Sequence, residues 1–339
     1  MALRGVLTLA FGAPKYIEMA KALGRSLMLH APETPRAVVT DSRDPELRKL
    51  YTATIEYRPS FGSNVRQKMY LDRYSPFDET LFIDSDCLVV GKLDVFWEAF
   101  RGLNFAVQGV QTLRTGDVDT FLDVDFVLQR FSLSGIPKFN GGIYFFNKSP
   151  EAVRLFETAR SLLKNARDLR FSDFRRDGPA DEALYGVAMA IEGLSVTDLG
   201  RRGMWSPGEL QGKIKIDVAK GICSFVKRVG EAKVPRLVEP DIMHFFGRFT
   251  ESLTYRRECV RLKKLLEGEI QKAGAITLSD ELKLRAMTIP LGYHRLRGYF
   301  RRATKAPVSA RLSQPPRPVS SSGVLRKARK LSSPAAKVE

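Results

Sequence analysis

The sequence predicts an α/β fold in which helices cover both faces of a doubly wound, parallel sheet. The first hundred residues alternate short apolar runs with amphipathic stretches of helical period, and this alternation is typical of parallel sheets with helices on both faces. Hydrophobic residues make up 44% of the 339-residue chain, which is enough to bury the core of one α/β domain with appendages. In such sheets, ligands bind outside the carboxyl ends of the strands.

Apolar periodicity and turn residues place the individual elements. Residues 5–11 form a predicted strand that stops at Gly12 and Pro14. The same segment, with Arg4 before an apolar run, resembles a secretory signal, but we favour the strand because an amphipathic helix follows directly. The further elements that we expect are a helix at 15–29, a strand at 36–40, helices at 45–52 and 66–74, a strand at 80–83, a strand through Phe146, and helices from Pro150, at 181–190 and at 252–273.

The chain changes character after about residue 250. Its last 37 residues are rich in Pro and Ser and lack aromatic residues, a composition that cannot offset the entropy lost on ordering. We therefore expect an α/β domain at 1–250, a helical extension at 251–302 and a disordered basic tail at 303–339.

The net charge of +17 is concentrated at the end of the chain. Residues 286–339 carry 12 Lys or Arg and a single acid, Glu339, so +11 of the +17 lies there. A basic chain invites the hypothesis of a nucleic-acid-binding protein. Because the charge is confined to the tail and no recognition-helix motif is present, we expect no nucleic-acid partner.

The spacing of the cysteines and the hydropathy indicate the cellular compartment of the protein. Cys87, Cys223 and Cys259 are widely spaced and form no Cys-x-x-Cys pair, which argues against a disulfide scaffold and a zinc site. No run of 18 apolar residues is present, so no membrane-spanning helix is predicted. We expect a cytoplasmic protein.

Two carboxylates follow the predicted strand at 80–83. In the stretch "TLFIDSDCLVV", Asp84 and Asp86 stand one residue apart between two apolar runs. One interpretation is a solvated strand end. The other is a site for a hard cation, since carboxylate oxygens suit Mg²⁺ or Mn²⁺, which can bridge to a diphosphate.

Four further features favour the cation site, although each has an ordinary structural explanation. Lys68 precedes Asp84 by 16 residues on a predicted helix, where a basic residue is commonly solvated. Two adjacent glycines loosen a strand and mark a turn or a close approach of a ligand. Acids at a helix start also serve as caps, and a lone histidine is often a core residue. The residues concerned are Lys68, Asn140, Gly141, Gly142, Asp181, Glu182 and His244.

Taken together, these motifs resemble those of the retaining glycosyltransferases of family 8, which include glycogenin and bacterial lipopolysaccharide galactosyl- and glucosyltransferases. The resemblance runs in order from Gly5 to about Phe249. It consists of "LTLAFG", the lysine before the acidic pair, "FIDSD", "FNGGIYFFN", "DGPADE" and "HFFG". It implies the GT-A fold, a Rossmann-like mixed sheet flanked by helices, followed here by the helical segment and the basic tail.

The resemblance also implies the ligands and the residues that bind them. It implies a nucleotide-sugar donor, UDP-glucose or UDP-galactose, a Mn²⁺ or Mg²⁺ ion, transfer with retention, and a glycan or lipid-linked acceptor. The implied metal ligands are Asp84, Asp86 and His244. The nucleoside is expected at Leu9, Ala10, Phe11 and Tyr16, the donor sugar and phosphates at Lys68, Asp84, Ser85, Asn140, Gly141, Gly142, Gly247 and Arg248, and the catalytic pair beneath the sugar is Asp181 and Glu182.

Two departures from the family pattern stand out. The family usually has Gln in place of Glu182, and an extra residue separates Gly178 from Asp181. The late motif usually continues to a Lys that binds the diphosphate, where this chain has Thr250. A chain that kept the fold as a binding module but lost activity would look the same.

Other hypotheses concern a rival enzyme class and the membrane. A haloacid-dehalogenase-like phosphohydrolase also has Asp-x-Asp after an apolar strand, but usually on its first strand and with Thr or Val where this chain has Leu88. The segment Ile289–Lys305 combines aromatic and basic residues, which suit an anionic membrane surface. The alternative is a helix packed on the α/β domain. We expect a peripheral enzyme on the inner face of the membrane.

Overall fold

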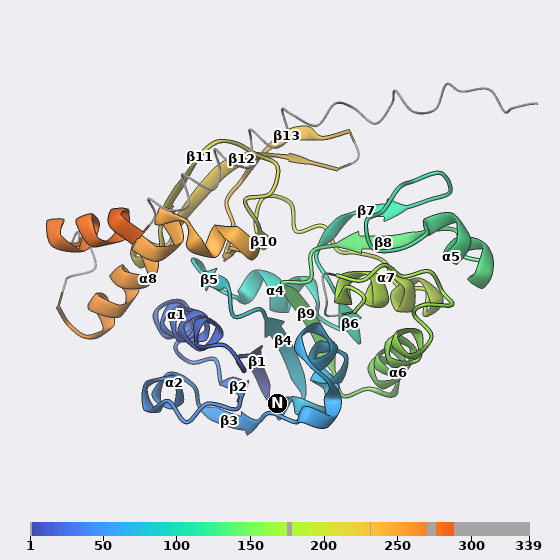
Figure 1. Cartoon of the computed structure of the whole chain (residues 1–339), viewed down its shortest axis with the longest axis horizontal. Helices are drawn as coiled ribbons and strands as arrows, with labels where there is room; N and C mark the ends of the chain where they lie inside the picture. The colour runs from blue at the N-terminus through green and yellow to red at the C-terminus, as the bar shows by residue number, and fades with distance from the viewer. Residues whose placement is uncertain (1, 175–177, 231, 270–275, 288–339) are drawn as a thin grey trace, which may run out of the picture. The chain divides into compact units, whose positions relative to one another are not determined.

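The structure is a computed structural model that describes residues 2–174, 178–230, 232–269 and 276–287 (Figure 1). The chain divides into two units, Met1–Thr288 and Ile289–Glu339. The second unit lies outside the described residues, and so do the predicted tail at 303–339 and the basic aromatic segment Ile289–Lys305. The boundary at residue 250 stays a prediction.

A six-stranded sheet forms the centre of the first unit, in the order β3-β2-β1-β4-β9-β6. The first four of these strands are parallel, whereas β9 runs antiparallel to both β4 and β6. The purely parallel sheet expected from the alternation is therefore wrong at this edge, and the mixed sheet implied by the GT-A resemblance is confirmed. The bounds are β1 Arg4–Leu9, β2 Arg36–Thr40, β3 Ala53–Glu56, β4 Glu79–Ile83, β6 Phe105–Ala106 and β9 Ile143–Asn147.

A short turn precedes β9. The turn, at Asn140–Gly142, connects β8 (Ile136–Phe139), which pairs with a strand of another sheet, to β9. In the pairing of β4 with β9, Ile83 lies opposite Ile143. The turn therefore lies at the carboxyl end of β4, beside Asp84.

Helices cover both faces of the sheet because the strand side chains alternate between them. Val6 and Leu81 pack with α1 and α4 on one face, and Leu7 and Phe82 pack with α6 and α7 on the other. In Figure 1, α1 and α2 accordingly lie on the opposite side of the sheet from α6 and α7. The bounds are α1 Pro14–His30, α2 Pro45–Leu50, α4 Asp94–Ala99, α5 Val124–Phe131, α6 Pro150–Lys164 and α7 Asp181–Ile191.

The predicted helix at 66–74 has a different form. The chain makes a 3₁₀ helix η2 (Asn64–Tyr70) and then a single α-turn, α3 (Leu71–Tyr74). Tyr70 leaves helical geometry, with φ −124° and ψ 21°, and so separates the two segments. The 3₁₀ helix contributes Lys68 and Met69 to the buried interior.

Three smaller sheets were not predicted from the sequence. One joins β5 (Cys87–Val89), β10 (Met204–Trp205) and β14 (Ile242–His244), with His244 opposite Cys87. A second pairs β7 (Gly109–Leu113) with β8. The third, in gold in Figure 1, is an antiparallel meander of β11 (Leu210–Asp217), β12 (Ile222–Val229) and β13 (Val234–Val238). Several of its positions face solvent and carry Lys, so its strands lack the apolar runs that identify buried strands.

The described part of the chain ends in helical structure. The helix α8 (Leu253–Leu266) packs against α1, and 276–287 contains a further helical segment at 278–287. The ion pair of Lys264 with Asp280 (2.9 Å) links α8 to this segment. The remaining short 3₁₀ helices are η1 Pro59–Phe61, η3 Val218–Lys220 and η4 Gly247–Glu251. Within the described ranges, no helix has both the length and the hydropathy needed to cross a membrane.

Candidate active site

Lys68 connects three elements at the carboxyl end of β4. Its Nζ lies 2.8 Å from Oδ2 of Asp84 and 2.9 Å from Oδ2 of Asp181, and it donates to the carbonyl of Gly141 at 3.0 Å. The lysine comes from η2, Asp84 from the end of β4, and Asp181 from the first turn of α7. The predicted residues Lys68, Asp84, Gly141 and Asp181 thus form one cluster.

Because the cluster is buried, the pKa of each charged group depends strongly on the charges of its neighbours. Burial alone would lower the pKa of Lys68, but the carboxylates of Asp181 and Asp84 outweigh it and raise that pKa. Burial also raises the pKa of Asp84 to about 6, against the attraction of Lys68. The Lys68 ammonium therefore stays charged between its two carboxylates. Removing one of the three charged groups would leave a buried charge without full compensation.

His244 is held between Asn140 and Asp86. Its Nδ1 lies 2.6 Å from Oδ1 of Asn140, and the backbone N–H of Gly142 donates to the same oxygen at 3.1 Å. That oxygen is therefore an acceptor, so Nδ1 carries the proton and donates. The Nε2 atom faces Oδ1 of Asp86 at 3.1 Å.

The pair of His244 and Asp86 fits a cation. In a neutral imidazole whose Nδ1 is protonated, Nε2 is an acceptor, so it and the carboxylate oxygen repel unless a proton or a metal ion lies between them. Burial alone would lower the pKa of His244 and raise that of Asp86, but the attraction between the two outweighs it in both. Imidazole nitrogen and carboxylate oxygen are ligands that divalent ions accept.

The groups around His244 and Asp86 show which residues could bind a metal ion at this site. Ligand atoms of Asp86, Cys87 and His244 lie within 4.8 Å of one another. Burial raises the pKa of the Cys87 thiol, which keeps its proton and makes it a poor ligand. Oδ2 of Asp84 lies 3.9 Å from Nε2 of His244 and is held by Lys68. A metal ion at this site would therefore be held by Asp86 and His244, with the second oxygen of Asp84 as a further ligand.

The two glycines of the turn are required by close packing. A Cβ added at Gly141 would lie 2.7 Å from the hydroxyl of Tyr144 and 2.8 Å from Oδ2 of Asp181. A Cβ added at Gly142 would lie 2.5 Å from Nδ1 of His244. These separations are too short for any larger residue, so the glycines let the turn lie against the polar cluster.

The acids of α7 lie against the same turn. Glu182 accepts a hydrogen bond from the backbone N–H of Gly141 at 2.8 Å, and the hydroxyl of Tyr144 donates to Asp181 at 2.7 Å. Burial, with the neighbouring Asp181 carboxylate, raises the pKa of Glu182. The predicted catalytic pair therefore belongs to the cluster around Lys68.

The residues expected to hold the nucleoside lie at and after the end of β1. Ala10 is buried, and Phe11 stacks on Tyr57 with ring centroids 4.5 Å apart. Tyr16 is 38% exposed in the first turn of α1. Leu9 is half-buried at the last position of β1. These residues lie near the carboxyl end of β1, at the same edge of the sheet as Asp84. Tyr57, the aromatic partner of Phe11, was not identified from the sequence.

The remaining predicted residues flank the acidic pair and follow β14. Ser85 is half-buried between Asp84 and Asp86. Gly247 and Arg248 begin η4, where Gly247 has φ 58° and Arg248 is exposed. The hydroxyl of Thr250 donates to the carbonyl of Gly247 at 2.8 Å. Within the described ranges, no hydrogen bond or ion pair joins Arg248 or Tyr16 to the cluster around Lys68.

Two tyrosines of the site were missed in the sequence. Tyr144 lies fully buried on β9 beside Asp181, and the hydroxyl of Tyr185 donates to the carbonyl of Lys68 at 2.7 Å. The available signals were a polar hydroxyl in the apolar strand "IYFF" and a tyrosine one helical turn after Asp181. Buried tyrosines usually bond their hydroxyl, so these two fix the positions of Asp181 and Lys68.

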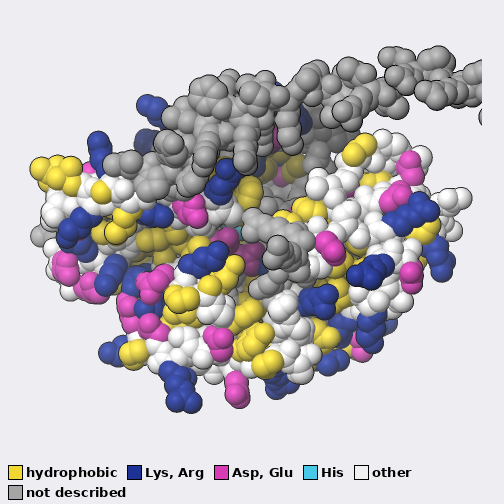
Figure 2. Space-filling view, viewed as in Figure 1, with side chains coloured by type: hydrophobic (Ala, Val, Ile, Leu, Met, Phe, Trp, Pro, Cys, Tyr) yellow, Lys and Arg dark blue, Asp and Glu magenta, His cyan; other side chains and the backbone are white. Residues whose placement is uncertain are grey.

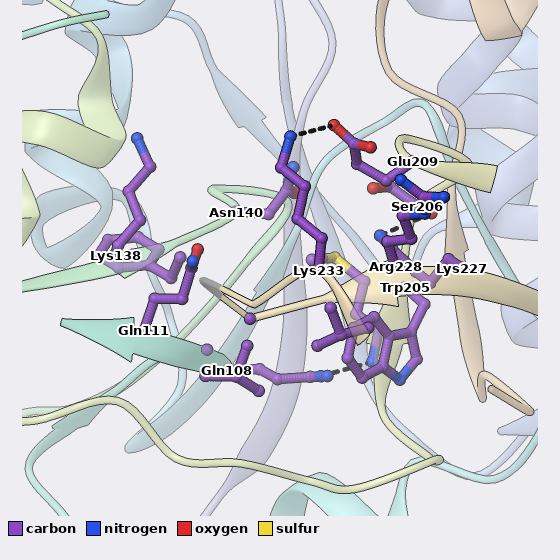
Figure 3. Close-up of a pocket in the computed structure, with 16 residues that line it drawn as sticks. Gln108, Gln111, Lys138, Asn140, Trp205, Ser206, Glu209, Lys227, Arg228 and Lys233 are labelled. Atoms are coloured by element: carbon purple, nitrogen blue, oxygen red, sulfur yellow. Dashed lines mark hydrogen bonds and ion pairs between the residues drawn. The ribbon is translucent and has the colours of Figure 1, made fainter. Parts of the chain in front are cut away.

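A pocket of about 300 Å³ adjoins the site at Asn140 (Figure 3). Gln111 and Lys138 come from the two-stranded sheet of β7 and β8 on one side, and Trp205 and Lys227 lie on the other. The remaining lining residues are Gln108, Gly109, Val110, Phe139, Met204, Ser206, Glu209, Arg228, Val229, Gly230 and Lys233. Apart from Asn140, no residue of this lining was predicted from the sequence.

Solved structures with a similar fold include glycosyltransferases. An active-site mutant of LgtC, in which Glu replaces a Gln, matches with a TM-score of 0.50 and 15% identity, over 78% of this chain and 95% of that chain. The fold is similar to that of LgtC. Two further neighbours are the galactosyltransferase LgtC with donor and acceptor sugar analogs (TM-score 0.43, 16% identity, 60% of this chain and 76% of that chain) and the bifunctional glycosyltransferase WbbM (TM-score 0.48, 12% identity, 78% and 51%).

The LgtC-like fold confirms the predicted fold class and bears on the rival hypotheses. No protein-family model matches the sequence, and no curated protein matches it. The GT-A type of sheet argues against a haloacid-dehalogenase-like phosphohydrolase. On the face shown in Figure 2, basic and acidic side chains are interspersed, which gives no support to nucleic-acid binding by that face.

Proposed function

We propose that the protein is a metal-dependent glycosyltransferase that moves glucose or galactose from its UDP derivative to a glycan or glycolipid acceptor with retention. The observation that carries this proposal is the pairing of His244 with Asp86 beside the Lys68 cluster, at the carboxyl end of β4 in an LgtC-like fold. Ligands of doubly wound sheets bind at this edge.

The donor diphosphate would lie beside the metal ligands. Asp86 and His244, with Asp84, would hold Mn²⁺ or Mg²⁺, and the bound ion would neutralise negative charge on the leaving diphosphate. Phe11 and Tyr16 would hold the base at the end of β1. The exposed Arg248 lies four residues after His244 and would supply a charge to the diphosphate in place of the lysine that the family motif has at Thr250.

The donor sugar would lie against the turn at Asn140–Gly142 and the acids of α7. One oxygen of Asp181 is bonded to Lys68 and Tyr144, and Glu182 is bonded to the turn. These bonds hold the two carboxylates in fixed positions, as stabilisation of a positively charged sugar requires. One LgtC neighbour carries Glu in place of an active-site Gln, and Glu182 stands where the family motif has Gln.

The test is release of UDP from UDP-glucose and UDP-galactose, with and without Mn²⁺. We expect release that depends on the ion and is lost in Asp86→Ala, and a product that keeps the anomeric configuration of the donor. Phosphate release from a phosphomonoester without UDP release would favour the phosphohydrolase. An inverted product would contradict the retaining mechanism.

The second candidate function is a binding module that keeps the fold with little catalysis. The departure at Thr250 favours it, because its hydroxyl is bonded to Gly247 and a threonine carries no charge for the diphosphate. Calorimetry with UDP-sugar and Mn²⁺ distinguishes the two functions. Saturable donor binding without UDP release, across a panel of acceptor sugars, would establish the module.

We further propose that the C-terminal part binds an anionic membrane surface. The described helical segment at 278–287 exposes Leu278 (76%), Leu282 (60%) and Met287 (60%), and the basic aromatic sequence Ile289–Lys305 follows it. Apolar side chains next to basic ones suit the interface of an anionic bilayer. Sedimentation with anionic and neutral vesicles tests this, using the full chain and a chain that ends at Met287. Equal pelleting of both would contradict it.

A further inference from the structure

A group of basic residues lines the pocket beside Asn140, and none of them belongs to the motifs that carry the family resemblance. Lys227 and Arg228 lie on β12, and Lys233 lies in the turn before β13. Lys138 enters from β8 on the opposite side (Figure 3). Among the described lining residues, Glu209 is the single acid.

Two of these four cations have no carboxylate partner within the described ranges. Lys138 pairs with Asp119, and Lys233 pairs with Glu209 at 3.7 Å. Lys227 instead donates to the backbone carbonyl of Ser206 at 3.1 Å, and its Nζ lies 5.3 Å from the ring centroid of Trp205.

The environment of Lys227 is costly for a cation. Burial lowers the pKa of Lys227 to about 8, against the weaker attraction of Glu209. Burying a charge without an opposite charge costs free energy, and a bound anion would recover that cost. Arg228, the next residue on β12, is exposed and also lines the pocket, so it adds positive charge to the lining.

The neutral part of the lining suits a sugar. Gln111, Asn140 and Ser206 offer amide and hydroxyl groups, and Trp205 offers an apolar surface. Small-molecule sites combine apolar walls with a few polar groups in this way, and about 300 Å³ lies at the lower end of their volumes.

We propose that this pocket binds an anionic saccharide, whose phosphate or carboxylate group contacts Lys227, with Arg228 adding to the positive charge of the lining. Asn140 lines the pocket and also bonds His244, so a saccharide bound there lies next to the candidate metal ligands. If the proposed function holds, on which this step rests, the saccharide is the acceptor, and the enzyme glycosylates acceptors that carry an acidic group.

The experiment measures binding of three probes to the full chain by calorimetry, without UDP-sugar: glucose 6-phosphate, glucuronate and glucose. We expect the two anionic probes to bind at least about tenfold more tightly than glucose, since hydrogen bonds to charged groups are worth more than neutral ones. Inorganic phosphate is measured alongside, and it should bind more weakly than glucose 6-phosphate.

The variant is Lys227→Gln with Arg228→Gln, and the matched control is Lys213→Gln with Lys215→Gln. The control residues are exposed on β11 of the same sheet and outside the pocket lining, so both pairs remove two positive charges. We expect the pocket variant to lose about tenfold or more in affinity for glucose 6-phosphate, and the control to keep it. Equal losses in both variants, or equal binding of glucose and its phosphate, would overturn the proposal.

A competition experiment separates this proposal from the proposed function. We expect UDP with Mn²⁺ to bind without displacing glucose 6-phosphate, and Asp86→Ala to leave binding of the sugar phosphate unchanged. Displacement by UDP would overturn the acceptor assignment, since the basic residues would then serve the donor diphosphate. If UDP fails to bind but the sugar phosphate binds through Lys227 and Arg228, the proposed function fails and the pocket assignment stands.

Discussion

Nε2 of His244, at the end of β14, lies 3.1 Å from Oδ1 of Asp86, just before β5, while Nδ1 of the same ring is bonded to Asn140. Because Asn140 fixes the tautomer, the free nitrogen and the carboxylate face each other as two acceptors. A proton on Nε2 or a metal ion between the two atoms removes this repulsion. The predictions that follow concern this pair, its neighbouring lysine, the acids of α7 and the glycine turn.

Asp86→Ala should abolish the Mn²⁺ dependence of UDP binding. The change removes an anion that faces His244, and even residues that only orient a metal ligand cost about 10–100-fold in affinity when mutated. Calorimetry with UDP, with and without Mn²⁺, measures this. The control is Glu157→Ala, an exposed acid on α6, which should bind as the unmodified chain does. Unchanged metal-dependent binding in Asp86→Ala would refute the metal site.

Lys68→Met should destabilise the protein by about 3–5 kcal/mol, the usual cost of breaking a buried ion pair. The change leaves the carboxylates of Asp84 and Asp181 without their shared cation. Urea denaturation gives the free energy of unfolding. Lys148→Met is the matched control, because its pair with Asp78 is exposed and spans 3.7 Å, and such pairs contribute about 0–1 kcal/mol. A similar small loss in both variants would show that Lys68 is not the centre of the cluster.

Glu182→Gln should raise the melting temperature at pH 7.5 and leave it nearly unchanged at pH 4. Burial raises the pKa of Glu182, so the folded state holds the proton more tightly than the unfolded state. The buried Glu182 therefore destabilises the folded state once the pH rises above its pKa in the unfolded chain. This loss of stability is complete above its pKa in the folded chain. The amide oxygen of Gln still accepts the bond from Gly141, so turnover should stay within about threefold, roughly 0.7 kcal/mol.

Asp181→Asn is the matched comparison for that variant, since it makes the same chemical change at the preceding residue. It removes one of the two carboxylates that balance Lys68, and turnover should fall far more than donor affinity. Thermal denaturation at both pH values and steady-state kinetics measure the two variants. A dead Glu182→Gln that still binds donor would make Glu182 a charged participant in the reaction.

Gly142→Ala should destabilise the chain by about 1–3 kcal/mol, as overpacking does, and weaken metal-dependent binding. The added Cβ would lie 2.5 Å from Nδ1 of His244 and 2.6 Å from the sulfur of Met204, so the imidazole must move. At Gly208 the nearest atoms to an added Cβ are 3.6 Å away, and Gly208→Ala should be tolerated. Thermal denaturation and Mn²⁺-dependent UDP binding check both. Equal stability of the two variants would contradict the close packing at the turn.

Local sequence patterns predicted the elements that build the sheet. The strand at 36–40 and the helices that begin at Pro150 and at Asp181 lie where the periodicity placed them. Caps and turns supported these positions, as with Ser149, whose side chain accepts from Ala152 at the start of α6. Such signals depend on neighbours within one or two turns of chain, so they can be recognised without knowing the fold.

The sequence also identified most of the polar cluster, because unusual residues stand at predicted strand and helix ends. Asp84 and Asp86 follow a buried strand, and Asp181 and Glu182 begin a helix. The sequence could not show which of these side chains are in contact. Lys68 was one basic residue among 55 until the fold placed its ammonium between two carboxylates from different elements.

The tertiary structure alone decided the pairing of β14 with β5 and the pocket beside Asn140. His244 lies opposite Cys87 because two three-residue strands far apart in the chain pair antiparallel, and strands this short carry almost no pattern of their own. The pocket depends on the meander β11–β13, whose exposed positions give its strands no continuous apolar run. Side-chain identity fixes local preference, whereas contacts between distant segments depend on how the whole core packs, and that packing sets the chemistry available at the site.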